Sequence, residues 1–200
     1  MATIRLATAF DSSAIAAIYK PYCEQSAVSF EQVAPTAVEM AKRVATVTSQ
    51  RPWIVLEHNG AVEGYAYAGA HHERWAYRWS VNTAIYISAA HQRRGAGRAL
   101  YVTLFDLLRH LGYYRAAAGI TLPNEASVGL HAALGFTLVG VYRDIGYKLG
   151  AWRDVAWYEA EIQPLVAEPQ EPRPMAALSG SSAWRDAVAL GLAHYKAEFP

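Results

Sequence analysis

Apolar residues recur along this chain with two different periods, which predict helices alternating with strands. Leucines at 100, 104, 107, 108 and 111 form one stripe at helical spacing, so 97–110 is the clearest predicted helix, with Gly112 ending it. Short apolar runs bounded by turn residues predict strands. These strands are expected at 3–7, 53–57, 61–70, 83–88, 115–121, 136–142 and 154–162.

Three further helices complete the predicted order. Asp11 or Ser12 can cap a helix that Pro21 is expected to bend or end. Pro35 and Thr36 open a second helix, and the dipeptide at 59–60 predicts a hairpin turn between two strands. A shorter helix starts after Asn124 and closes at 135. The resulting order, β-α-α-β-β-β-α-β-α-β-β, predicts an α/β fold.

The composition changes at Pro164, so the chain divides into a domain of residues 1–163 and a tail of residues 164–200. Four prolines between 164 and 174 and the Ser/Gly run at 179–182 are typical of a linker. A short helix is predicted over 182–198, with Trp184, Val188 and Tyr195 on its apolar face. This face is too small to stand alone. We expect it to dock on the domain or on a partner subunit, or to remain partly disordered.

Charge and cysteine content exclude several classes of partner. The net charge is +1 with 18% charged residues, which indicates neither nucleic-acid binding nor a membrane surface. No apolar run approaches the length of a membrane span. Cys23 is the single cysteine, which fits a reducing cytoplasm. The seven histidines show no metal-ligand spacing, and the pair His71 and His72 is interpreted as solvated, so no metal is expected.

A glycine turn between a predicted strand and the strongest helix carries the clearest chemical signal. Two glycines two residues apart leave the turn without bulky side chains, so backbone N–H groups and the helix N-terminus can approach an anion. The neighbouring polar and cationic side chains suit the same ligand. A coenzyme with a diphosphate is therefore predicted here, with an ordinary arginine-rich loop as the alternative. The turn comprises Gln92, Arg93, Arg94, Gly95, Ala96 and Gly97.

The element order and this turn resemble the GCN5-related N-acetyltransferase (GNAT) superfamily. Segments 77–82, 122–136 and 146–155 are similar to its phosphinothricin and methionine sulfoximine acetyltransferase branch. The resemblance covers about residues 3–163. It implies a GNAT fold, a mixed twisted sheet of about seven strands splayed at its centre with helices on both faces. It also implies acetyl-CoA as co-substrate, a small-molecule amine as acceptor, and a homodimer.

The resemblance further implies which residues contact the coenzyme. The pantetheine arm would bond to strand backbone, and the glycine turn would hold the pyrophosphate. The backbone groups would be those of Ile85, Tyr86 and Ile87, which otherwise are simply core strand. Asn124 would also contact the coenzyme, although the same residue is a good helix N-cap, and both roles are compatible.

The resemblance assigns proton transfer and substrate recognition to other side chains. His131 would protonate the departing CoA thiolate, with a packed core histidine as the alternative. Arg78, and less directly Arg74, would bind the substrate's anionic groups, and each could instead be an exposed loop arginine. Phe30 and Glu31 would line the acceptor pocket, or simply belong to a loop between two helices.

One position departs from the branch. Asn82 stands where the branch usually has a glutamate that serves as general base, and an amide cannot accept the proton. We expect a slower enzyme with a steeper alkaline pH dependence, a different acceptor, or another base such as Glu31 acting through water. The preferred hypothesis is an N-acetyltransferase that works by direct attack in a ternary complex. The alternative is an acyl-CoA-binding module with weak or lost catalysis.

Overall fold

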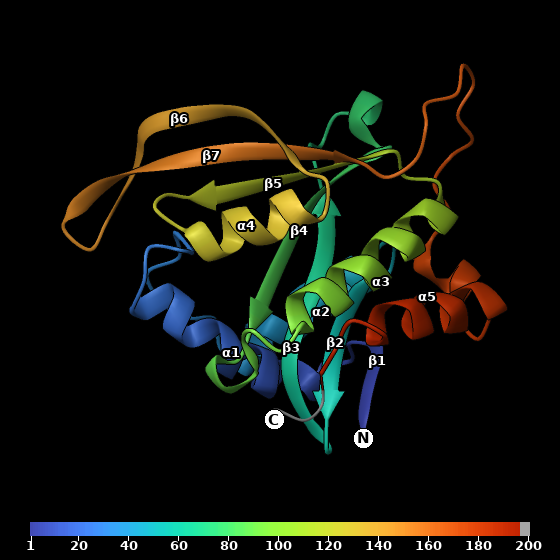
Figure 1. The fold of residues 1–200 in the computed structure, drawn as a ribbon, viewed down its shortest axis with the longest axis horizontal. Coiled ribbons are helices and arrows are strands. Elements are labelled where there is room, and N and C mark those ends of the chain that lie inside the picture. Colours follow the sequence, from blue (N-terminus) through green and yellow to red (C-terminus); the bar gives the residue numbers. More distant parts are fainter. Residues whose placement is uncertain (197–200) are drawn as a thin grey trace.

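The protein is described here by a computed structural model, in which residues 1–196 are placed. A single seven-stranded mixed sheet has the order β1-β2-β3-β4-β5-β7-β6 (Figure 1). All neighbouring strands are antiparallel except β4 and β5, which are parallel. The strands are β1 (Ala2–Leu6), β2 (Trp53–His58), β3 (Ala61–Ala70), β4 (Ser80–Ile87), β5 (Arg115–Thr121), β6 (Thr137–Lys148) and β7 (Ala151–Glu161).

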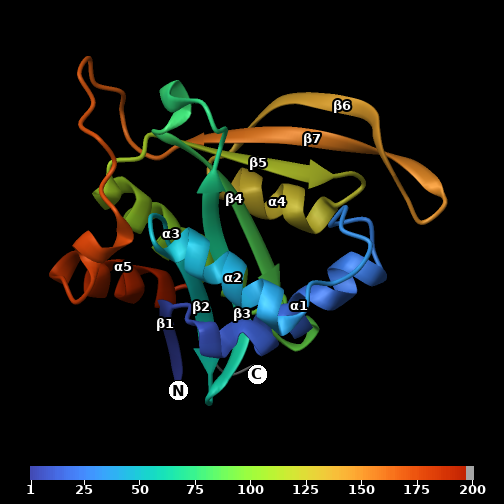
Figure 2. The ribbon, with the colours of Figure 1, turned by 180° about the vertical axis from the view of Figure 1, so that it is seen from behind.

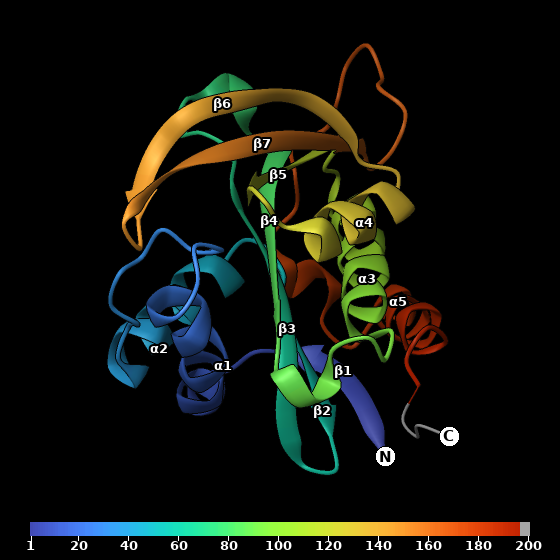
Figure 3. The same cartoon turned by 60° about the vertical axis from the view of Figure 1, so that its left-hand side comes forward.

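Helices cover both faces of the sheet. In Figure 3, α1 and α2 lie on one side of β1–β4, while α3 and α5 lie on the other, with α4 above α3 beside β5. Figure 2 shows the molecule from behind, so that α1 and α2 lie in front of the sheet. The helices are α1 (Ser12–Glu24), α2 (Ala37–Thr48), α3 (Ala96–Leu111), α4 (Glu125–Ala133) and α5 (Ser182–Leu192). The expected α/β fold with helices on both faces is confirmed.

Two apolar cores, one on each face, hold these layers together. The predicted leucine stripe of α3 is fully buried against β2–β5, as its helical spacing requires. On the opposite face, Ile15 and Tyr19 of α1 and Met40 of α2 pack on Trp53 and Tyr65 of β2 and β3. The sheet is therefore anchored from both sides, which fixes the strand ends where the candidate site lies.

Strands β4 and β5 separate in the middle of the sheet. Their parallel pairing covers only three residue pairs, Ser80 with Arg115, Val81 with Ala116, and Asn82 with Ala117. Beyond Asn82, β4 continues to Ile87 paired with β3 alone, and β5 continues paired with β7. The sheet is thus splayed at its centre, as expected, and Asn82 belongs to the last pair before the split.

The structure excludes one of the two outcomes expected at Pro21, and it changes the bounds of the last two strands. Pro21 does not end α1, because the helix continues to Glu24 and Gln25 N–H bonds to the Pro21 carbonyl at 3.0 Å. Proline removes only one helical hydrogen bond, and packing of α1 on the sheet sustains the next turn. The last two strands are also longer than predicted, because they form one hairpin. Its turn places Leu149 and Gly150 at φ 52° and 76°, the positive values that tight hairpin turns require.

The tail docks on the domain itself, which is one of the three alternatives left open by the sequence. Met175, Leu178 and Ala187 are buried in the α3-side core. Helix α5 approaches α3 closely because Gly191 has no side chain. A Cβ at Gly191 would lie 2.0 Å from the Thr103 hydroxyl. The helix ends at Leu192 rather than 198, and the last two positions of the predicted span lie outside the described residues.

Candidate active site

The split between β4 and β5 contains a small cavity of about 60 Å³. Both strands line it, together with Val28, and Tyr101, Asn124 and His131 face it from α3 and from the start and body of α4. The Ile87 carbonyl accepts a hydrogen bond from Tyr22 Oη at 2.6 Å. In an antiparallel ladder, the N–H and C=O of one residue point to the same side. Main-chain groups of Ile87, and of Ile85 two residues before, therefore face the open edge, whereas those of Tyr86 face β3.

The predicted anion turn is built as a backbone cradle. Arg93 and Gly95 both have left-handed backbone conformations, with φ 61° and 78°. Such residues turn successive N–H groups toward one point, and the resulting concavity binds anions. Gly95 is also the N-cap of α3, and it supplies no side-chain cap to the first N–H groups of this helix. The positive end of a long helix thus points at the cradle, which suits a pyrophosphate.

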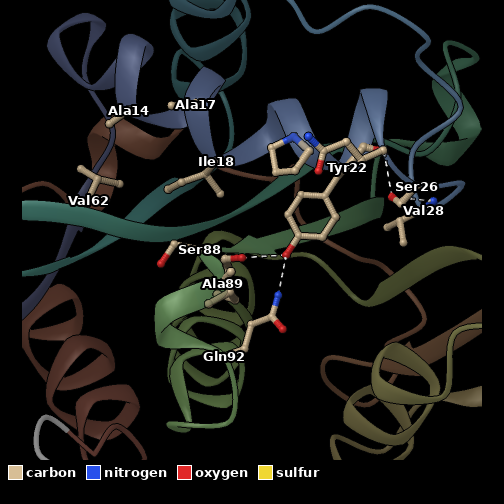
Figure 4. A pocket seen from close by; sticks show the side chains of 13 residues that line it. Ala14, Ala17, Ile18, Tyr22, Ser26, Val28, Val62, Ser88, Ala89 and Gln92 are labelled. Atoms are coloured by element: carbon tan, nitrogen blue, oxygen red, sulfur yellow. Dashed lines mark hydrogen bonds between the residues drawn. The ribbon is translucent and has the colours of Figure 1, made fainter.

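A larger hollow of about 620 Å³ lies beside this turn, on the α1 side of β4 (Figure 4). Ile18, Tyr22 and Val28 line it from α1 and the following loop, and Gln92 lines it from the glycine turn. Gln92 Nε2 donates to Tyr22 Oη at 3.1 Å, and this hydroxyl in turn holds the Ile87 carbonyl. Tyr22 therefore fixes the glycine turn relative to the end of β4.

His131 is buried in a polar chain that reaches the split. Its Nδ1 donates to the Ser127 carbonyl at 2.8 Å, so Nε2 accepts from the Tyr101 hydroxyl at 2.9 Å. The same hydroxyl lies 3.4 Å from Thr83 Oγ1 on β4. Burial lowers the pKa of His131 and raises that of Tyr101, so both groups are neutral at physiological pH. Tyr101, which the sequence analysis missed, connects His131 to the split.

Asn124 caps α4, and it also lines the cavity between the strands. Its side-chain oxygen accepts from Ser127 N–H at 3.1 Å, as predicted for an N-cap. The amide nitrogen is not needed for the cap, because an asparagine amide has separate donor and acceptor groups. The position is therefore compatible with both roles considered for Asn124.

Phe30 and Glu31 belong to a loop that the β6–β7 hairpin holds in place. Lys148 is 5% exposed, and its ammonium donates to the carbonyls of Cys23, Ser29 and Glu31, so all three donors are satisfied. Phe30 packs against Gly146 of β6, where a Cβ would come within 2.2 Å of the ring. The glycine is thus required for the hairpin to contact this loop.

Glu31 accepts hydrogen bonds that make its carboxylate a poor base. Arg43 donates to both of its carboxylate oxygens, at 2.7 and 2.9 Å, and Tyr19 adds a third hydrogen bond at 3.0 Å. The hydrogen bonds from Arg43 are the main reason why the pKa of Glu31 is lowered. A carboxylate held this way binds a proton weakly, so the geometry does not favour Glu31 as the replacement base.

Arg78 contacts the C-terminal tail. Its Nε and Nη2 donate to the Glu171 carboxylate, both at 2.7 Å, and the Trp79 indole donates to the Gln170 carbonyl at 2.9 Å. The guanidinium also stacks 3.6 Å from the Trp79 ring. Arg74 is exposed on the same segment, where it precedes a short 3-10 turn. Neither arginine lines the cavity between β4 and β5.

Asn82 has a partner that its sequence neighbours do not suggest. His71, the first residue after β3, lies with Nδ1 2.8 Å from the Asn82 side-chain oxygen. The antiparallel register places Gly69 opposite Asn82, so a residue two positions later leans over the same end of β4. The interpretation of His71 and His72 as a solvated pair was therefore wrong for His71, which is half-buried.

Within residues 1–196, no group of three or more His, Cys, Asp or Glu side chains lies close enough to hold a metal ion. In the same range, no helix has the length and apolar character needed to cross a membrane.

Comparison with known proteins agrees with this geometry. Residues 4–157 match the acetyltransferase (GNAT) domain family. The chain is 40% identical over 172 residues to phosphinothricin N-acetyltransferase of Streptomyces viridochromogenes, covering 86% of this chain and 93% of that protein. It is 34% identical to L-methionine sulfoximine/L-methionine sulfone acetyltransferase of Salmonella typhimurium, covering 82% and 97% of the two chains.

A solved structure extends the similarity to three dimensions. The phosphinothricin acetyltransferase of Sinorhizobium meliloti, crystallised in complex with AcCoA, superposes with a TM-score of 0.81 at 36% identity, covering 86% of this chain and 95% of that one. The splayed sheet and the anion turn agree with the family match and with this structural similarity. This chain therefore belongs to the GNAT family and is an acetyl-CoA-dependent N-acetyltransferase.

Proposed function

We propose that the protein acetylates the α-amine of a small amino acid of the phosphinothricin or methionine sulfone type. The observation that carries this proposal is the separation of β4 and β5 directly after Asn82 and Ala117. A peptide-like pantetheine arm can complete the hydrogen bonds that the open edge of β4 leaves unmade. The anion turn at the end of β4 would hold the pyrophosphate, so the thioester would lie beside Asn82.

Acetyl transfer proceeds in this proposal by direct attack of the amine on the thioester, without an acyl-enzyme. Cys23 is fully buried, and burial raises the pKa of its thiol, so it is unsuited to act as a nucleophile. A main-chain N–H on the open edge of β4 would polarise the thioester carbonyl. The Tyr101 hydroxyl would supply the proton to the departing thiolate, and His131, whose Nε2 accepts from that hydroxyl, would assist by orienting it.

Acceptor recognition is assigned to the loop and arginines predicted from the sequence. Phe30 and Glu31 stand at the hairpin side of the split, where Lys148 fixes their backbone. Arg78 offers the bidentate geometry that suits a carboxylate. The Glu171 carboxylate of the tail already uses this geometry. A substrate carboxylate would therefore compete with Glu171 for this guanidinium.

A second copy of the chain is the proposed partner. β6 is the last strand of the sheet, and its hairpin with β7 exposes several large apolar side chains. A long exposed apolar edge strand is a surface that proteins normally cover. Pairing of two hairpins would remove this surface from water. The side chains concerned are Leu138, Val139, Tyr142, Ile145, Tyr147 and Trp152.

Release of free CoA thiol from acetyl-CoA, measured with a panel of amino acids from mildly acidic to alkaline pH, tests the proposed function. We expect saturable release with L-phosphinothricin or L-methionine sulfone, rising toward alkaline pH as more amine becomes neutral. The alternative function, an acyl-CoA-binding module, predicts saturable acetyl-CoA binding without thiol release from any acceptor.

A further inference from the structure

Asn82 and His71 form a pair in which the histidine is the hydrogen-bond donor. The Asn82 side-chain oxygen is an acceptor, so the His71 Nδ1 that lies 2.8 Å away carries the hydrogen. In a neutral imidazole the other nitrogen, Nε2, then has the free lone pair. Within residues 1–196, no protein group makes a hydrogen bond to this Nε2.

The pair lies next to the opening of the split, where β4 and β5 are still joined. Asn82 belongs to the last residue pair that joins β4 to β5, and the split that would hold the thioester opens directly after it. Gly69 lies opposite Asn82 on β3, two residues before His71. His71 is half-buried, with its ring 5.5 Å from that of Tyr77, so its position is fixed by two contacts.

We propose that His71 is the general base for the attacking amine and that Asn82 is the positioning residue that fixes its tautomer. The proposal rests on the acetyl transfer proposed above and supplies the proton acceptor that an amide at position 82 lacks. An asparagine that holds a histidine by Nδ1 leaves Nε2 free to accept a proton, which a lone asparagine cannot do.

The proton and electron pairs balance over one turnover. His71 Nε2 takes one proton from the substrate ammonium, which leaves a neutral amine. The amine nitrogen lone pair attacks the thioester carbon, the new C–N bond forms, and the C–S bond breaks with its electron pair on sulfur. The Tyr101 hydroxyl delivers its proton to the thiolate, and the second nitrogen proton restores that hydroxyl, so the products are the amide, free CoA thiol and one proton on His71, which passes to solvent.

Two other candidate bases are less suitable. Glu31 is bound by Arg43 through both carboxylate oxygens and by Tyr19, as described above. His72 is exposed, and it has no hydrogen bond to Asn82. The titratable neighbours of His71 are Tyr77 at its ring and His72, Glu73 and Arg74 along the same loop.

The test compares His71→Gln with His72→Gln, an adjacent exposed control, on L-methionine sulfone and acetyl-CoA. We expect His71→Gln to lower kcat/KM near neutral pH by about 10²-fold, the usual contribution of a general base, and His72→Gln to change it little. The loss should shrink at alkaline pH, where the amine is already neutral, because no base is then needed. The KM for acetyl-CoA and the unfolding midpoint should stay close to wild type.

Variants at Asn82 separate positioning from packing. Asn82→Ala should reproduce part of the His71→Gln defect, whereas Asn82→Asp, which also accepts from Nδ1, should retain activity. A His71→Gln defect of equal size at every pH, or none, overturns the proposal. Absence of thiol release from the wild-type protein with every amino acid would instead contradict the proposed function itself, so the two failures are distinguishable.

Discussion

Arg78 and Glu171 are ninety-three residues apart in the chain, yet the arginine Nε and Nη2 each lie 2.7 Å from the carboxylate. The ion pair joins the segment before β4 to the tail that follows β7. Because Arg78 also stacks on Trp75 and Trp79, its guanidinium is held in one orientation. The tail therefore occupies the arginine that the family resemblance assigns to substrate.

Glu171→Gln should make Arg78 available to an acceptor carboxylate. We expect a lower KM for the amino acid and an unchanged kcat, because the tail carboxylate no longer competes for the guanidinium. Stability should fall by at most about 1 kcal/mol, as for an exposed ion pair. Steady-state kinetics with varied acceptor checks this expectation. An unchanged KM would restrict Arg78 to anchoring the tail.

Tyr101→Phe should remove the hydroxyl between His131 and Thr83 while keeping the ring packed against Phe105 and Phe136. We expect kcat to fall by about 10²-fold, as for loss of an acid–base group, with little change in the KM for acetyl-CoA. Rapid single-turnover measurements would locate the loss in the chemical step. Wild-type kcat in this variant would show that the Tyr101 hydroxyl is not the proton donor to the thiolate.

Gly95→Ala should weaken binding of acetyl-CoA. Gly95 has φ 78°, and a Cβ there would lie 1.9 Å from the His194 carbonyl of the tail. The left-handed conformation alone costs a non-glycine residue about 1–2 kcal/mol, which corresponds to about a tenfold change in affinity if the turn relaxes out of its bound shape. Calorimetric titration measures this affinity. Gly129→Ala on α4, where a Cβ meets nothing within 4 Å, is the matched control.

The buried His131 makes stability depend on pH. Burial lowers its pKa in the folded state, so the unfolded chain binds a proton more readily at mildly acidic pH. The stability that neutral His131 contributes is present above about pH 6.5, the ordinary value, and is lost as pH falls toward the lowered folded-state pKa. His131→Gln should flatten the decline of the urea midpoint over this range. An unchanged slope would assign the decline to other groups.

The β6–β7 hairpin should determine the oligomeric state. Ile145 is 56% exposed on β6, and Ile145→Glu would place a charge on the surface proposed to contact a second copy. We expect sedimentation equilibrium to give a dimer for the wild type and a monomer for this variant. Val166→Glu, which changes a similarly exposed residue outside the hairpin, is the control and should remain dimeric. A monomeric wild type would contradict the proposed interface.

The fold was predictable because its signals are local. The leucine stripe of α3 and the glycine turn before it lie within twenty residues of each other and predict both a helix and an anion site. Asn124 likewise caps α4 as its position after a proline indicates. Family resemblance then implied a mixed sheet splayed at its centre, which periodicity alone does not determine.

The connections between site residues were not predictable, because they depend on register and on distant contacts. Tyr101 lies on the apolar stripe of α3, where a tyrosine is normally a packing residue, and its bond to His131 spans thirty residues. His71 follows a strand and looks exposed until the β3–β4 register brings it to Asn82. Neither the sequence around Arg78 nor the sequence around Glu171 predicts that these two residues pair.

The central claim is that the split beside Asn82 transfers acetyl groups to an amino acid. Its most direct test is mass-spectrometric detection of N-acetylated L-methionine sulfone or L-phosphinothricin together with free CoA thiol, using purified protein and acetyl-CoA. We expect equal amounts of amide and thiol, both absent when the amino acid is omitted. Saturable binding of acetyl-CoA with neither product formed from any amino acid would contradict it.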